Sequence, residues 1–265
     1  MKLPFIPLFF TLIFPSIIWA KRMPSFSPQI KKQIGMMLWK NEANQQCDLL
    51  AFWNPKEPFP SFGIAHAIWY PQGYRASFTE TFPLLLDFLI KKNIILPDWL
   101  KETRYLGAPW KDKESFDKDI KRKGFLKKLL YETIDLQTDF VIKQFHTKWK
   151  RIKKNIPFKE KNDLEKKYRL LSATPEGIFA LIDYCNFKGD GLNPKERYCG
   201  QGWGLYQVLN QMDTPCTSQE ALVSFIQAAK QILQKRIENC PPNLPSEKHW
   251  LKGWQNRIEK YKTLS

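Results

Sequence analysis

Apolar residues recur every three to four positions along most of this chain. Ser27 and Pro28 form a helix-start signal, and Ile30 and Ile34 follow at helical spacing, which predicts a helix from about residue 28 to about 41. Similar stripes lie within 82–89, 115–155, 178–184, 222–237 and 250–261. The pattern is typical of amphipathic helices packed around a shared core.

One segment alternates instead of following the helical period. Residues 62 to 70 place apolar side chains around Gly63, and Pro71 ends the segment, which is typical of a short β element. No internal repeat, low-complexity tract or linker divides the sequence. The pattern therefore predicts one mainly α domain over residues 21–265, with a small β-hairpin near 61–71.

The first twenty residues have the organisation of a secretory signal peptide. Lys2 supplies a short basic start, the run 3–19 is almost entirely apolar, and Ala20 is a small residue before the expected cleavage point. An uncleaved anchor is the alternative, because Ile18 is bulky for a cleavage motif and Lys21 follows directly. No later run reaches ~18 apolar residues. We therefore expect a periplasmic or secreted protein that is free of the membrane once residues 1–20 are removed.

Basic residues outnumber acidic ones by 42 to 26, which gives a formal net charge of +16. Such a charge favours anionic partners: nucleic acid, anionic lipid or an anionic wall polymer. An exported protein rarely meets nucleic acid, so we expect an anionic cell-envelope polymer as the partner. A generic basic surface is the alternative.

The five cysteines do not form a metal-binding pattern. The chain has no CxxC pair and no histidine at a zinc-ligand spacing, so neither a metal nor another cofactor is expected. An odd number in an oxidising compartment leaves at least one free thiol. Cys185 and Cys199 flank one polar loop and are the best candidates for a disulfide. Alternatively, all five are buried apolar side chains.

The stretch from Trp39 to Tyr70 carries the strongest chemical signal. Glu42 lies at the predicted end of the first helix, and Glu57 follows a Trp-Asn-Pro turn. Cleavage of a glycosidic bond needs a proton donor for the leaving oxygen and a second carboxylate. The negative end of a helix dipole disfavours ionisation, so we expect Glu42 to have a raised pKa and to act as the acid. Glu57 is then expected to supply the second carboxylate.

Other side chains of the same stretch suit a sugar cleft. Rings can stack on sugar faces, and a hydroxyl can position a water. The candidates for sugar contact are Trp53, Ser61, His66, Trp69 and Tyr70. The alternative is that the aromatic rings form core and Glu57 is an exposed loop acid. A Cys-His hydrolase is a weaker hypothesis, because no signature of such enzymes surrounds Cys47.

The same stretch resembles the active-site region of the lysozyme-like superfamily, which includes phage-type lysozymes and, more distantly, chitosanases. Those enzymes place an acidic Glu at a helix end, followed by a hairpin with an Asp and a Thr before Gly-Ile-Gly-His. Here Glu42 matches the acid, Ser61 falls at the Thr, and residues 63–66 read Gly-Ile-Ala-His. The Asp is absent from its expected place, and Glu57 is the nearest carboxylate. The resemblance implies an α+β lysozyme-like fold and a wall-glycan or chitosan-like substrate.

A glycine-containing loop over residues 183–207 is the expected second wall of the cleft. Its Gly204-Leu205-Tyr206-Gln207 segment is similar to a Gly-Leu-Met-Gln segment that lines the sugar cleft of lytic transglycosylases. The candidates for substrate contact in this loop are Asp183, Glu196, Arg197, Trp203 and Gln207. The alternative is a structural loop in which Arg197 pairs with Asp190 or Glu196.

Together these patterns favour an exported glycosidase, either a hydrolase or a lytic transglycosylase. We expect it to cleave peptidoglycan or a related β-linked amino-sugar polymer of the cell wall, with Glu42 as the general acid. We also expect the protein to be a monomer. A protein of another class fits the same residues: a non-catalytic glycan-binding or envelope-interaction protein on a lysozyme-like scaffold. The missing Asp favours this second hypothesis.

Overall fold

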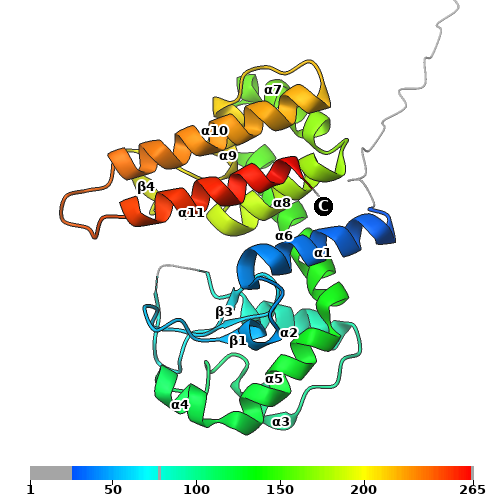
Figure 1. Cartoon of the computed structure of the whole chain (residues 1–265), viewed down its shortest axis with the longest axis vertical. Coiled ribbons are helices and arrows are strands. Elements are labelled where there is room, and N and C mark those ends of the chain that lie inside the picture. Colours follow the sequence, from blue (N-terminus) through cyan, green and yellow to red (C-terminus); the bar gives the residue numbers. More distant parts are fainter. Residues whose placement is uncertain (1–25, 77–78, 264–265) are drawn as a thin grey trace, which may run out of the picture.

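The computed structural model describes residues 26–76 and 79–263, and these are mainly helical (Figure 1). The mainly α prediction with a small β element is therefore confirmed. The expected signal peptide lies outside the described residues. Within the described ranges, no helix combines the length and the apolar character that a membrane crossing needs.

The helices and strands follow one another along the chain with short connections. The α-helices are α1 (Pro28–Ala43), α2 (Phe82–Lys91), α3 (Asp98–Thr103), α4 (Lys113–Lys118), α5 (Ile120–Glu132), α6 (Ile134–Asn155), α7 (Phe158–Leu171), α8 (Pro175–Lys188), α9 (Leu205–Gln211), α10 (Ser218–Glu238) and α11 (Lys248–Glu259). The short 3₁₀ helices are η1 (Cys47–Leu50) and η2 (Lys260–Lys262), and the strands are β1 (Ala51–Phe52), β2 (Ser61–Phe62), β3 (Ala67–Ile68), β4 (Arg197–Tyr198) and β5 (Gln201–Gly202).

The molecule has two lobes joined by α6 (Figure 1). The first lobe holds β1–β3 with α2–α5, and the second holds α7–α11 with the β4–β5 hairpin. Helix α1 packs on α6 and also contacts α8 of the second lobe. The C-terminal end of α1 therefore lies where the two lobes meet, and this places Glu42 between them.

Helix α1 begins and ends where its sequence signals predict. The Ser27 Oγ atom accepts a hydrogen bond from the Ile30 amide at 3.3 Å, and Asn44 takes the left-handed conformation that ends the helix, with φ of 47°. The long apolar stripe of 115–155 instead divides at Asp119 and Thr133. At the second division the Thr133 hydroxyl donates to the Leu129 carbonyl at 2.8 Å.

The three-stranded sheet is antiparallel in the order β1-β2-β3. Phe62 pairs with Ala51 on one side and Ala67 on the other. The tight turn from Gly63 to His66 is fixed from α6, because the Gln137 Oε1 atom accepts a hydrogen bond from the Ile64 amide at 3.0 Å. The buried Gln137 thus sets the position of the Gly-Ile-Ala-His segment relative to the helix that joins the lobes.

The rings expected to stack on sugars are part of the core. Trp69 is fully buried and lies edge-on to Phe62 and Trp110. Tyr70 is 2% exposed and Trp53 is 4% exposed. The prediction of sugar stacking by these three rings is wrong, because rings that are packed against other side chains have no open face for a sugar. The alternative interpretation, that the rings form core, is the one the structure bears out.

Gly35 makes the close approach of α1 and α6 possible. A Cβ atom at this position would lie 2.2 Å from the Thr138 Oγ1 atom, which is held by donation to the Ile134 carbonyl at 3.0 Å. We predict that Gly35→Ala lowers the free energy of unfolding by about 1–3 kcal/mol through overpacking. Chemical denaturation measures this.

Gly124→Ala is the matched control. Gly124 lies inside α5 and has no neighbouring atom within 4 Å of a Cβ, so alanine there should raise stability by about 0.5–1 kcal/mol. Equal effects of the two substitutions would contradict the packing argument.

Candidate functional site

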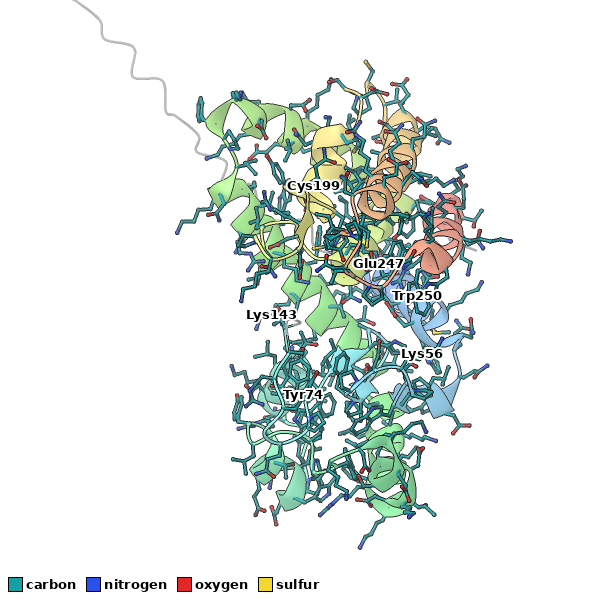
Figure 2. All side chains as sticks on the ribbon, turned by 90° about the vertical axis from the view of Figure 1, so that its left-hand side faces the viewer. Lys56, Tyr74, Lys143, Cys199, Glu247 and Trp250 are labelled. Atoms are coloured by element: carbon teal, nitrogen blue, oxygen red, sulfur yellow. The ribbon has the colours of Figure 1, made fainter. Side chains whose placement is uncertain are left out.

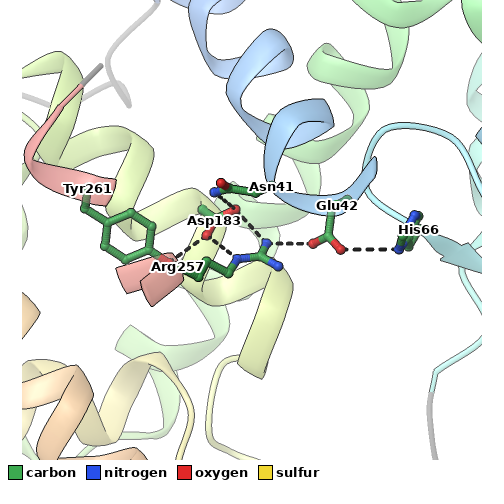
Figure 3. A network of polar contacts seen from close by, with 6 residues as sticks. All are labelled: Asn41, Glu42, His66, Asp183, Arg257 and Tyr261. Carbon is green, nitrogen blue, oxygen red and sulfur yellow. Dashed lines mark hydrogen bonds and ion pairs between the residues drawn. The ribbon is translucent and has the colours of Figure 1, made fainter. Parts of the chain in front are cut away.

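Glu42 sits in the last turn of α1 and connects both lobes (Figure 3). Its Oε1 atom accepts a hydrogen bond from Arg257 Nη2 of α11 at 2.6 Å. Its Oε2 atom lies 3.3 Å from His66 Nδ1, in the turn before β3. The Glu42 side chain is only 14% exposed. Two of these three residues, Glu42 and His66, belong to the stretch that the sequence singled out.

Arg257 is the centre of the network around Glu42. Its Nε and Nη2 atoms donate to the two carboxylate oxygens of Asp183 at 2.8 and 2.7 Å. The Tyr261 hydroxyl donates to Asp183 Oδ2 at 2.6 Å, and Asn41 Nδ2 lies 3.4 Å from Oδ1. Asp183 was predicted to contact substrate, but it is fully buried. It orients the guanidinium that holds Glu42.

The pKa of Glu42 is lowered, in contrast to the expectation from the sequence. Burial alone raises the pKa of this carboxyl, but the positive charge of Arg257 and the neighbouring His66 outweigh it. Burial lowers the pKa of His66, against the opposing influence of Glu42, so the imidazole is neutral near pH 7. The pKa of Arg257 is raised well above its usual value by Asp183 and Glu42 despite its burial. Glu42 is therefore ionised at neutral pH, because the ion pair with Arg257 outweighs the effect of burial.

A cavity of about 830 Å³ lies between the lobes. Its apolar wall comes from Phe62, Leu85 and Phe140, and its polar wall from α6 and the loop after α8. Of the predicted contacts, Glu196 and Arg197 line it. Glu42 and His66 do not, although Ala65, the neighbour of His66, does.

The loop after α8 is braced rather than free. Asp190 is buried and pairs with Arg151 of α6, whose Nε atom donates to Oδ2 at 2.5 Å. The alternative pairing of Asp190 with Arg197 is therefore not the one that forms. Arg197 is exposed at the cavity wall. The ion pair thus fastens the loop after α8 to α6 at the cavity wall.

Two predicted sugar contacts in this loop have structural roles instead. Gln207 accepts from the Gly204 amide at 3.1 Å and donates to the Gly191 carbonyl at 3.0 Å. Gly191 has φ of 82° and lies close to Gly204. A Cβ atom on Gly204 would be only 2.2 Å from the Gly191 nitrogen. Trp203 is 7% exposed and lies beneath the Arg236 guanidinium, 3.9 Å from the ring centroid. Neither side chain lines the cavity between the lobes.

Glu57 does not face Glu42. It lines a second cavity of about 560 Å³, together with Trp53, Gln72 and Tyr74 of the first lobe. Partial burial at this rim raises the pKa of Glu57. No hydrogen bond or ion pair joins Glu57 to Glu42 among the described residues. The structure therefore does not bring Glu57 to Glu42 as the expected second carboxylate, because three prolines carry the chain away from the end of α1 before it returns as β2.

The remaining predicted residues are Ser61 and the two cysteines of the expected disulfide. Ser61 is 8% exposed within β2 and lines neither of them. Cys185 is buried in α8 whereas Cys199 is exposed in the β4–β5 turn, and both thiols are free. The predicted Cys185–Cys199 disulfide is therefore not formed, because the loop between them folds Cys185 inward and Cys199 outward. Among the described residues, no cluster of three or more His, Cys, Asp or Glu could hold a metal ion.

Sequence reasoning missed Arg257 and Tyr261. These two residues are four apart on the same face as Ile258, which is buried. The available signal was the presence of an arginine and a tyrosine in an apolar stripe. Such an arginine indicates a buried ion pair, because a buried guanidinium needs acidic partners. Arg257 is 215 positions from Glu42, and nothing local in the sequence identifies its partner.

The buried position of Arg257 predicts a large effect on stability. Arg257→Met fills a similar volume but leaves Glu42 and Asp183 without their cation, so we expect the free energy of unfolding to fall by about 3–5 kcal/mol. Arg169→Met, at an exposed site on α7, is the control and should change it by less than about 0.5 kcal/mol. Urea unfolding at pH 7 measures both, and equal stability of the two variants would contradict the network.

The lowered pKa of Glu42 also predicts how stability depends on pH. Its contribution is complete above the unfolded-state pKa of about 4.5 and is lost as pH falls through the folded-state pKa. Glu42→Gln should be less stable than the wild type at pH 7 by about 1–3 kcal/mol. The gap should close as pH falls below 4.5. A gap that is constant from pH 7 to pH 3 would show that Glu42 is not an ionised partner of Arg257.

Comparisons with known proteins found no matching family model, no similar curated protein and no similar solved structure. Function is therefore inferred from the residues and their geometry.

Proposed function

We propose that this protein is an exported, lysozyme-like glycosidase that cleaves peptidoglycan or a related β-linked amino-sugar polymer. One observation carries the proposal: Glu42 at the end of α1 meets His66 of the Gly-Ile-Ala-His turn, with 3.3 Å between Oε2 and Nδ1. The resemblance to phage-type lysozymes predicts that these two segments meet. A helix end that approaches a hairpin between two lobes is the arrangement such a site requires.

The cavity between the lobes supports a polymeric and acidic substrate. Its volume of about 830 Å³ lies within the range of ligand-binding sites. Lys148, Arg151 and Arg197 line it against the acidic Asp190 and Glu196, and Asp190 is already paired with Arg151. Within residues 26–76 and 79–263, no ion pair is formed by Lys148 or Arg197, and these two cations favour a glycan that carries carboxylates, as peptidoglycan does.

The site holds one candidate acid rather than two. Ordinary glycoside hydrolysis uses a pair of carboxylates about 5–9.5 Å apart, and Asp183, the other carboxylate of the network, is already held by Arg257 and Tyr261. A single carboxylate suits transglycosylation better. Glu42 would give its proton to the leaving oxygen, a hydroxyl of the same sugar would attack the anomeric carbon, and its proton would return to Glu42.

Glu42 must carry a proton for this step, although Arg257 lowers its pKa in the free protein. A glycan chain that extends from the cavity past Ala65 to Glu42 would exclude water from the carboxyl, and desolvation favours its neutral form. Because the free protein binds this proton only in acid, kcat/KM should rise as pH falls toward the pKa of Glu42. Acidic conditions are therefore the appropriate ones for detecting turnover.

A non-catalytic glycan-binding protein is the second candidate. The ion pair between Glu42 and Arg257, with Nη2 and Oε1 2.6 Å apart, favours it. In that role the cavity would hold the glycan, and the network would serve only to join the lobes. The two candidates differ in turnover and not in binding.

Glu42→Gln separates the two candidates. With wild-type protein on purified sacculi at acidic pH, we expect soluble fragments that are lighter by one water molecule than hydrolysis products. Glu42→Gln should lower the rate ~10²–10⁴-fold, because general acid catalysis is worth about that much, while sacculus binding is retained. Mass spectrometry of the fragments and co-sedimentation measure the two properties.

Two further variants complete this test. Glu102→Gln, at an exposed site on α3, should behave as the wild type. Glu57→Gln should also keep its activity, and its loss would instead indicate a two-carboxylate hydrolase. Binding without turnover by the wild type, or full activity of Glu42→Gln, would replace the glycosidase by the binding protein.

A further inference from the structure

Two cysteines of the second lobe lie on segments that contact each other. Cys199 is exposed at the turn of the β4–β5 hairpin, with φ of 48°. Cys240 follows the C-terminal end of α10 and is half-buried. The Cys199 Sγ atom lies 3.8 Å from the carbonyl oxygen of Asn239, the residue before Cys240. By standard peptide dimensions the Cys240 Cα atom is then within roughly 7 Å of that sulfur.

Independent contacts hold the hairpin against the end of α10. Asn239 Nδ2 donates to Gln201 Oε1 at 3.1 Å, and the Arg236 guanidinium lies 5.8 Å from the centroid of the Tyr198 ring. Figure 1 shows β4 beside α10 and α11, and Figure 2 shows Cys199 in the second lobe. The approach of the two cysteines is therefore a property of the fold and not of one flexible side chain.

We propose that Cys199 and Cys240 form a disulfide that fastens the β4–β5 hairpin to the end of α10. The Cys240 sulfur lies 3.9 Å from the carbonyl oxygens of both Pro241 and Pro245, and bond formation requires it to leave these contacts and rotate toward Cys199. The segment after Cys240 has no regular structure before α11, so it can follow this adjustment. The proposed export enters only as the source of an oxidising environment.

The other three cysteines are excluded as partners by their positions. Cys185 is buried, and burial raises the pKa of its thiol to about 11, which leaves it unreactive. Cys216 precedes α10 at its other end, and a helix of 21 residues is ~30 Å long. Cys47 begins η1 in the first lobe. The pairing of Cys199 with Cys240 is therefore the one that the fold permits.

The reaction is an exchange with a small-molecule disulfide such as oxidised glutathione. One cysteine thiolate attacks a glutathione sulfur, forms a mixed disulfide and releases one glutathione thiolate. The second cysteine thiolate then attacks the protein sulfur of that mixed disulfide and releases the second glutathione. Two thiol protons leave the protein, and two electrons pass to the glutathione disulfide.

The test uses the purified full chain in a mixture of oxidised and reduced glutathione. After acid quenching and alkylation of the free thiols, peptide mapping without reduction should give one dominant cross-linked peptide pair that contains Cys199 and Cys240. Cys216→Ser and Cys47→Ser are matched controls and should leave that pair unchanged. Cys199→Ser and Cys240→Ser should abolish it.

A second measurement keeps the test informative about the folded state. The unfolding equilibrium constant of the oxidised chain should be roughly 30- to 1000-fold smaller than that of the reduced chain, and the difference should vanish in Cys199→Ser. Separate alkylation of Cys199 and Cys240, or a dominant pairing with another cysteine, would overturn the proposal. Neither measurement uses a glycan, so its outcome is independent of the proposed activity.

Discussion

The contact between Arg257 and its two carboxylates is the interaction on which the rest of the site depends. One guanidinium, 12% exposed, donates to both Glu42 and Asp183. It therefore joins α1, α8 and α11 at one point. Buried charges are tolerated only when they are paired, so each member of this network requires the others. The position of Glu42 follows from this pairing as much as from the helix that carries it.

The same contact gives the site opposing chemical properties. An acid catalyst needs a proton, and Arg257 favours its loss from Glu42. A carboxylate with a purely structural role needs only a paired cation, and Arg257 is that cation. The balance between these roles depends on the surroundings of the carboxyl, because burial raises its pKa against the influence of the guanidinium. The pKa of Glu42 is therefore the quantity that distinguishes an acid catalyst from a scaffold carboxylate.

Local sequence signals were sufficient to predict most helices and the β-hairpin. They were not sufficient to predict which residues pair over long distances in the sequence. Ser27 and Pro28 identified the start of α1, and the spacing of apolar residues identified most of the later helices. The Gly63 to His66 turn was recognised because a short motif lies within one segment. The partner of Glu42 could not be recognised, since Arg257 is distant in sequence and its charge resembles that of many other basic residues. Aromatic residues misled for a related reason, because Trp69 in a core and a ring in a sugar cleft have the same local pattern.

The closure of the site by α11 has a consequence for the order in which the chain matures. Arg257 lies 215 positions after Glu42 and 74 after Asp183, so both carboxylates are synthesised before the cation that pairs with them in the folded protein. A chain that is emerging from a ribosome can form its earlier helices, but the junction of the lobes stays open to water until α11 packs against them. The junction of the lobes is therefore completed late, by a helix that is distant in sequence from the one that carries Glu42.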